Sequence, residues 1–141
     1  KFNSVIKDIC SLFNDFGEAD YIGEPVSLIE HSLQAANEAA KSVKKSGRKD
    51  DELILGSLFH DLGHIIAIAD EKNGIRVVEN MAGCGAKDHE HIGGDYLKDA
   101  GFSDRVVEIC RGHVKAKRYF CWNDPMYHKK LSEASKTTLG F

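Results

Sequence analysis

The chain lacks the features that mark several classes of protein. None of its four cysteines forms a C-x-x-C pair. We therefore expect neither a disulfide framework nor a zinc knuckle, and predict reduced thiols that lie mostly in the core. No apolar run approaches the roughly 20 residues that a membrane span needs. The first 16 residues also lack the uninterrupted apolar stretch of a signal peptide. These absences predict a soluble, cytoplasmic protein that does not bind membranes.

A block of charge of one sign is absent as well. Nineteen basic and 22 acidic side chains give a net charge of -3, and the basic residues are dispersed. A nucleic-acid partner is not expected, because such proteins usually carry a basic patch or stripe. Repeats and low-complexity tracts are also missing. A length of 141 residues is typical of one domain, so we expect a single domain over residues 1–141.

What the sequence does contain is helical periodicity. Apolar residues at spacings of three and four predict an amphipathic helix over residues 2–16, ended by Gly17. Further helices are predicted over residues 25–45, with Pro25 in the first turn, and over residues 88–97, 103–113 and 125–138. No segment reads convincingly as a strand. The prediction is an all-α domain of five or six helices.

The third predicted helix is the most apolar one. Asp50 is a suitable N-cap, and the apolar run over residues 53–59 is too continuous for a surface helix. We expect this helix to be the central and most buried element. Residues 70–86, which follow it, are rich in turn formers and have no sustained period. They are predicted to form a long connection that covers a functional site.

Histidines and one aspartate mark that site. His60 and Asp61 are adjacent on the central helix, about 100° apart around its axis, so both can reach one ion. A buried carboxylate is costly unless it is paired or metal-bound, and its second oxygen can bind a second ion. With His31 beside His60 at the first ion, and His89 and His113 at the other, the five residues predict a carboxylate-bridged two-metal site.

The remaining histidines need separate interpretations. His64 lies four residues after His60, a spacing that resembles the H-E-x-x-H motif of zinc proteases, but the acid is the shorter Asp. We interpret His64 as lying beside the site, either supporting a ligand or acting catalytically as a proton donor. His91 would point to another helix face than His89, and His128 stands among lysines, so both are predicted to be exposed. His89 is preferred as the ligand because small residues follow it where backbones must pass closely.

The order of these residues resembles the HD-domain superfamily. A lone His, then His-Asp, then His-Glu-x-x-Gly, then a last His follow one another within residues 21–138. The resemblance implies a single HD-domain helical bundle around a dinuclear metal site. Most members of that superfamily are metal-dependent phosphohydrolases, so hydrolysis of a phosphomonoester or phosphodiester is one candidate activity. A catalytically inert regulatory domain is another, although the intact His-Asp pair and its partner histidines argue against it.

Three further segments resemble a narrower group. Residues 21–24, 113–119 and 131–139 look like the HD-domain diiron oxygenases that cleave organophosphonates. This group is typified by the glycine-forming 2-amino-1-hydroxyethylphosphonate dioxygenase and is related to myo-inositol oxygenase. The resemblance implies a mixed-valence Fe(II)/Fe(III) pair, O2 as co-substrate, and cleavage of the C-P bond of a 1-hydroxyalkylphosphonate, in organophosphonate catabolism. From 2-amino-1-hydroxyethylphosphonate the products would be glycine and phosphate.

The resemblance also implies roles for individual residues. The metal ligands would be His31, His60, the bridging Asp61, His89 and His113. The phosphonate would be held by Lys117, Ser135 and Thr138, the substrate ammonium would pair with Glu24, and Tyr21 would lie over the open iron position. Each of the last five also has an ordinary explanation, as a solvated charge, a polar helix position or a half-buried loop aromatic.

One expected ligand has no counterpart in the sequence. The resemblance implies a final Asp ligand on a helix well beyond Thr138. Asp124 is the only aspartate after His113 and follows it by eleven residues, which is too short a step. We therefore expect the natural protein to continue past Phe141 with a C-terminal segment that supplies this ligand.

Overall fold

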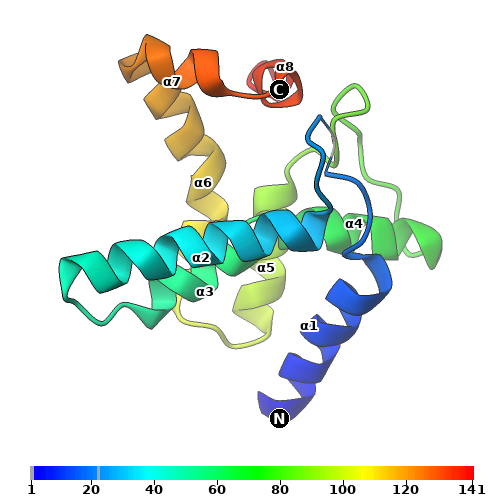
Figure 1. Ribbon diagram of the computed structural model, residues 1–141. Coiled ribbons are helices and arrows are strands. Elements are labelled where there is room, and N and C mark those ends of the chain that lie inside the picture. The colour runs from blue at the N-terminus through cyan, green and yellow to red at the C-terminus, as the bar shows by residue number, and fades with distance from the viewer. Residues whose placement is uncertain (1, 22) are drawn as a thin grey trace.

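The computed structural model describes residues 2–21 and 23–141, and this part of the chain is all-helical, as predicted. Two isolated β-bridges, Asp20 to Ser27 and Asn80 to Ala86, are the extended pairings it contains. The described residues form eight helices rather than five or six (Figure 1). They are α1 (Phe2–Phe16), α2 (Leu28–Ser46), α3 (Asp51–Phe59), α4 (Leu62–Lys72), α5 (His89–Asp99), α6 (Asp104–Asn123), α7 (Pro125–Lys130) and α8 (Glu133–Thr138).

The first two helices show how local signals set helix ends. Helix α1 covers the predicted range, and the Gly17 N-H donates to the Phe13 carbonyl at 2.8 Å where it ends. Helix α2 begins at Leu28, so the predicted start at Pro25 is wrong. The reason is a capping box, in which the Ser27 hydroxyl accepts from the Glu30 N-H and the Glu30 carboxylate accepts from the Ser27 N-H.

The predicted central helix is interrupted. Asp50 caps α3 as expected, accepting from the Leu53 N-H at 3.1 Å. The helix then breaks at His60 and Asp61, where Asp61 has φ -103° and ψ 12°, and resumes as α4. The prediction that His60 and Asp61 lie within one continuous helix is therefore wrong. Burial is also uneven, because α4 contributes six buried residues and α3 contributes two.

The C-terminal helices differ from prediction in length. Helix α6 runs ten residues past the predicted end at His113, because no helix breaker occurs before Asp124 and Pro125. The single helix predicted over residues 125–138 is split into α7 and α8 by Ser132, whose hydroxyl caps α8. The later part of α6 extends away from the other helices and carries α7 and α8 at its far end (Figure 1).

The core lies where α4, α5 and α6 meet. Leu62, Ile65, Leu97, Val106 and Cys110 are its fully buried large side chains. All four cysteines lie in the described part of the chain, and Cys110 alone among them is buried, so the prediction that the thiols lie mostly in the core is wrong, although all four are free.

The segment Asp51–Lys72 is long and apolar enough to cross a membrane, with a mean hydropathy of 1.4, contrary to the expectation that no such run exists. Half of that window is buried within the domain. It also contains the buried Asp61. Both features are typical of helices in a protein core rather than of a membrane span.

Helices α4 and α5 pass each other in very close contact. A Cβ atom at Gly63 would lie 1.9 Å from the His89 carbonyl oxygen, and a Cβ at Gly93 would lie 3.0 Å from the Gly63 nitrogen. Two glycines at the crossing allow the backbones to approach. This confirms the prediction that small residues after His89 mark a close backbone contact. The crossing places the first residue of α5 directly beside the α3–α4 break.

Candidate metal centre

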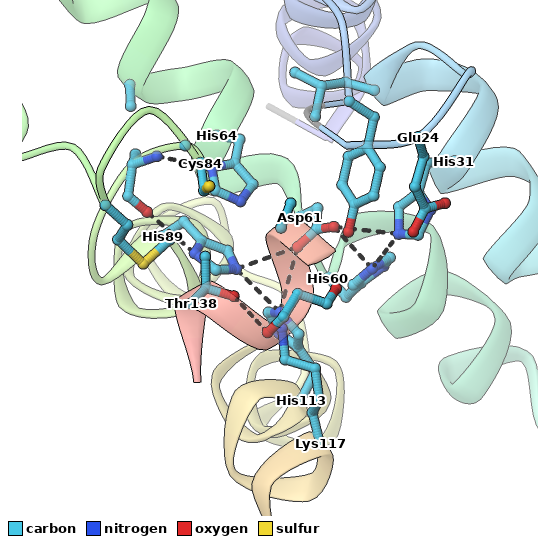
Figure 2. Close-up of a pocket in the computed structure, with 18 of the residues that line it drawn as sticks. Glu24, His31, His60, Asp61, His64, Cys84, His89, His113, Lys117 and Thr138 are labelled. Atoms are coloured by element: carbon cyan, nitrogen blue, oxygen red, sulfur yellow. Dashed lines mark hydrogen bonds and ion pairs between the residues drawn. The ribbon is translucent and has the colours of Figure 1, made fainter. Parts of the chain in front are cut away.

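The five predicted metal ligands converge in the structure. His31 comes from α2, His60 and Asp61 from the α3–α4 break, His89 from the start of α5, and His113 from the middle of α6. All five line one cavity of about 500 Å³, with Asp61 only 3% exposed (Figure 2).

Asp61 lies between two pairs of histidines. Its Oδ2 is 3.1 Å from His60 Nε2 and 3.3 Å from His31 Nε2. Its Oδ1 is 3.2 Å from His89 Nε2 and 3.3 Å from His113 Nε2. Within each pair the two Nε2 atoms are 3.1 Å apart. We call His31, His60 and Asp61 the first metal position, and Asp61, His89 and His113 the second. The pairing is the one predicted from the sequence.

The hydrogen bonds behind the rings show that these atoms are suited to a cation. The Nδ1 atoms of His60 and His113 each lie 2.7 Å from a backbone carbonyl, of Ser57 and Cys110. A carbonyl only accepts, so each Nδ1 carries a proton, and in the neutral ring each Nε2 presents a lone pair. Lone pairs that face carboxylate oxygens at about 3 Å repel one another unless positive charge lies among them. The donor set therefore fits metal ions.

The charges around Asp61 support the same conclusion. Burial alone would raise the pKa of Asp61, but in the metal-free centre protonated His60, together with His113 and His31 beside the carboxylate, holds it well below the usual value. Burial alone would lower the pKa of His60, but the Asp61 carboxylate outweighs this and raises it. The centre thus keeps Asp61 ionised and attracts positive charge to the space around it.

His64 belongs to the cavity but is not placed as a ligand. Its ring stacks on that of His89, with centroids 3.8 Å apart and planes at 18°. Its Nδ1 accepts from the Ala86 N-H at 3.1 Å, so its Nε2 carries the proton. Burial, aided by the neighbouring His89, lowers its pKa to about 3. A neutral ring of this kind can donate a hydrogen bond, which favours the supporting role over that of a proton donor.

Two residues of the loop before α2 line the same cavity. The Tyr21 ring lies parallel to that of His31, with centroids 3.9 Å apart and planes at 10°. Burial, together with the charges of Asp61 and Glu24, raises the pKa of Tyr21, so its hydroxyl stays protonated. Glu24 is exposed at the edge of the cavity. Ile22, which belongs to the same motif, lies outside the described residues.

The residues implied to hold a phosphonate come from α6 and α8. Lys117 lies one helical turn after His113, and Figure 2 shows Lys117 and Thr138 beside that histidine. Ser135 also lines the cavity, and its carbonyl accepts from the Thr138 hydroxyl at 3.1 Å. Every residue predicted for the site therefore lines this one cavity. His91 and His128 are exposed, which confirms that prediction.

Sequence reasoning missed the contribution of one loop. Residues 70–86 were expected to cover the site, but no role was assigned to any of them. Met81, Cys84, Gly85 and Ala86 line the cavity, and Ala86 bonds to two of the histidine rings. The glycines of this loop indicated a tight turn, but nothing in the sequence indicated which rings the turn would meet.

Comparison with known proteins places this chain in a family. The sequence pattern of the HD domain matches residues 28–137. An uncharacterized protein of Acanthamoeba polyphaga mimivirus is 38% identical over 134 residues, which cover 95% of this chain and 56% of the relative.

Two relatives have named activities. The [1-hydroxy-2-(trimethylamino)ethyl]phosphonate dioxygenase (glycine-betaine-forming) of Leisingera caerulea is 32% identical over 94% of this chain and 61% of its own length. The hydroxymethylphosphonate dioxygenase of Gimesia maris is 31% identical over 93% of this chain and 59% of its own length. The chain thus spans a little over half the length of the curated relatives it matches.

Proposed function

This chain belongs to the HD-domain family, and from that premise we propose that it is a diiron dioxygenase that cleaves the C-P bond of a 1-hydroxyalkylphosphonate. The observation that carries the proposal is the pair of metal positions that share Asp61. They lie in a cavity that is also lined by a lysine and two hydroxyl side chains. The relationship of this chain to two phosphonate dioxygenases supports the same reaction class.

The ligand atoms favour iron over softer metals. Both positions offer imidazole nitrogen and carboxylate oxygen, and neither includes a thiolate. Such donors suit first-row ions, including iron. When bound, a mixed-valence Fe(II)/Fe(III) pair would supply the activation of O2 and the Lewis acidity toward the substrate hydroxyl and phosphonate oxygens. Asp61 would hold the two ions together by giving one oxygen to each.

Charged residues of both signs line the cavity, which suggests how the substrate is oriented. Lys117, Ser135 and Thr138 line it, and a cation with two hydroxyls suits a phosphonate. Glu24 and Tyr21 also line it, and the Tyr21 ring stacks on that of His31. We propose that the phosphonate binds beside Lys117 and the carbon chain points toward Glu24.

For the substrate we propose 2-amino-1-hydroxyethylphosphonate, whose ammonium group would pair with Glu24. The reaction breaks the C1-P bond, oxidises the two-carbon fragment to glycine and releases phosphate. Both atoms of O2 end up in the products, which balances the reaction without another reductant. The substrates in the names of the two relatives share the 1-hydroxyphosphonate part and differ at the other end. That other end would meet Tyr21 and Glu24.

The decisive experiment measures phosphate release with and without O2. Protein loaded anaerobically with Fe(II) is given 2-amino-1-hydroxyethylphosphonate, its N-trimethyl analogue or hydroxymethylphosphonate in separate reactions. Phosphate that appears only with O2, together with glycine from the amino substrate, would support the proposal. Asp61→Asn is the matched control, since it removes the shared charge.

Other outcomes point to the competing functions. Release of phosphate from phosphate esters without O2 would indicate a phosphohydrolase, in which the same ions activate water. Iron binding without either activity would indicate an inert domain. Turnover of the trimethylated compound alone would correct the substrate but keep the reaction class.

A further inference from the structure

We propose that Gly85 and Ala86 are positioning residues of the metal centre, because they hold two stacked histidine rings in the orientation that the second metal position requires. The inference rests on the proposed function only in taking the centre to bind metal. It concerns backbone groups of the loop over residues 79–87, which contribute no ligand of their own.

Ala86 contacts both rings through its backbone. Its N-H donates to His64 Nδ1 at 3.1 Å, and its carbonyl lies 3.2 Å from His89 Nδ1 and accepts from it. One residue therefore determines which nitrogen is protonated in each ring. His89 is left with a lone pair on Nε2, 3.2 Å from the Asp61 carboxylate. Because the two rings also stack on each other, neither can turn without disturbing the other.

The loop itself is held by its own backbone hydrogen bonds. The Met81 N-H donates to the Gly85 carbonyl at 2.9 Å, and the Lys87 N-H donates to the Glu79 carbonyl at 2.8 Å. Between these bonds the chain turns tightly, with positive φ at Gly83 (81°) and Gly85 (100°). The peptide groups of Ala86 are thus presented from a closed turn rather than from a free loop, and this fixes their direction toward the rings.

Gly85 has no room for a side chain. A Cβ atom there would lie 2.6 Å from His64 Cε1 and 2.9 Å from His64 Nδ1, closer than real Cβ contacts. Any side chain would therefore push the His64 ring, and through the stacked pair would displace His89. Gly83, two residues earlier, also has a positive φ, but a Cβ there would meet nothing within 4 Å. Gly83→Ala is therefore a matched control for the strain of replacing a glycine in this turn.

The test compares Fe(II) binding, under anaerobic equilibrium dialysis, by the wild type, Gly83→Ala and Gly85→Ala. The wild type and Gly83→Ala are expected to bind two ions with similar affinities. Gly85→Ala should lose about 10- to 100-fold in affinity at one position, the usual effect of disturbing a group that orients a metal-bound histidine. The first position should be unchanged, because among the described residues no hydrogen bond or ring contact joins His31 or His60 to this loop. Equal affinities in the two variants, or an equal loss at both positions, would overturn the inference.

A second comparison asks whether the effect passes through His64. In a His64→Ala background the clash is removed, so adding Gly85→Ala should weaken Fe(II) binding no more than adding Gly83→Ala. If Gly85→Ala still lowers the Fe(II) affinity by about 10- to 100-fold in that background, Gly85 does not act by positioning the His64 ring.

A third measurement does not depend on any variant folding. Nitrogen-15 NMR of the metal-free wild type should show His64 protonated on Nε2 and His89 protonated on Nδ1. The opposite tautomer at His64 would overturn the inference. None of these readouts requires turnover, so a protein that gives the expected results but releases no phosphate would refute the proposed function alone. If the wild type cleaves phosphonates but Gly85→Ala and Gly83→Ala bind iron equally well, this inference alone is refuted.

Discussion

Replacing Gly63 by alanine should be much more damaging than a glycine-to-alanine change in a helix usually is. The added Cβ would lie 1.9 Å from the His89 carbonyl oxygen, 2.7 Å from its carbonyl carbon and 2.9 Å from the Gly93 nitrogen. All three are backbone atoms, so no side-chain rotation can relieve the clash. To reach even 3.0 Å from that oxygen, α5 must shift by about 1.1 Å, the difference between the two distances.

Two opposing effects determine the size of the change. Overpacking costs about 1–3 kcal/mol, whereas alanine in a helix gains about 0.5–1 kcal/mol over glycine. We expect Gly63→Ala to lower the free energy of unfolding by up to roughly 2.5 kcal/mol, the largest cost less the smallest gain. Gly112→Ala in α6 is the matched control, because its Cβ would meet nothing within 4 Å. It should raise stability by about 0.5–1 kcal/mol.

The assay is urea unfolding of the metal-free protein, followed by helical circular dichroism, with Fe(II) binding measured separately. Gly63→Ala should also weaken the second metal position, since the shift displaces His89. If Gly63→Ala is as stable as the wild type and binds two irons with unchanged affinity, the close crossing of α4 and α5 is not what places His89. Destabilisation by Gly112→Ala to the same extent would show that the loss has another cause.

Four other predictions test the centre directly. Asp61→Asn should abolish binding of the iron pair, measured as iron per protein, because no carboxylate remains to bridge; two retained irons would contradict this. Metal affinity should fall as the pH is lowered through the pKa of His60, which is raised in the metal-free protein, by about tenfold per unit for one competing proton; a flat competition titration would refute it. Burial raises the pKa of Cys110 to about 12, so iodoacetamide should alkylate it far more slowly than exposed Cys10, and equal rates would argue against its burial. Glu24→Gln should raise KM for the amino substrate more than it lowers kcat, yet leave hydroxymethylphosphonate unaffected, and an unchanged KM would exclude the proposed ammonium contact.

Local patterns in the sequence predicted much of the helical architecture. The apolar spacing over residues 2–16 and the cap at Asp50 depend on neighbouring residues alone, and both predictions were confirmed. The start of α2 was wrong although its signal is also local, because the capping box at Ser27 and Glu30 outweighs the preference of Pro25 for a first turn. The break at Asp61 has no such signal, since apolar residues continue on both sides of it.

The sequence by itself determined the chemistry of the site. Histidine and aspartate are metal ligands by their atoms, and their order along the chain was enough to select the five that converge. The sequence grouped His31 with His60 and His89 with His113. The packing of α2, α5 and α6 around the α3–α4 break brings the first pair to Oδ2 of Asp61 and the second pair to Oδ1. Helices α4 and α5 pack closely because no side chain at Gly63 separates their backbones.

Only the tertiary structure decided how the rings are oriented. Ala86 acts through its N-H and carbonyl, groups that almost every residue possesses, so no residue type in the sequence could mark it. The same is true of the carbonyls of Ser57 and Cys110 behind His60 and His113. The chemistry of a side chain can be read from the sequence, whereas the direction of a backbone group depends on the fold around it.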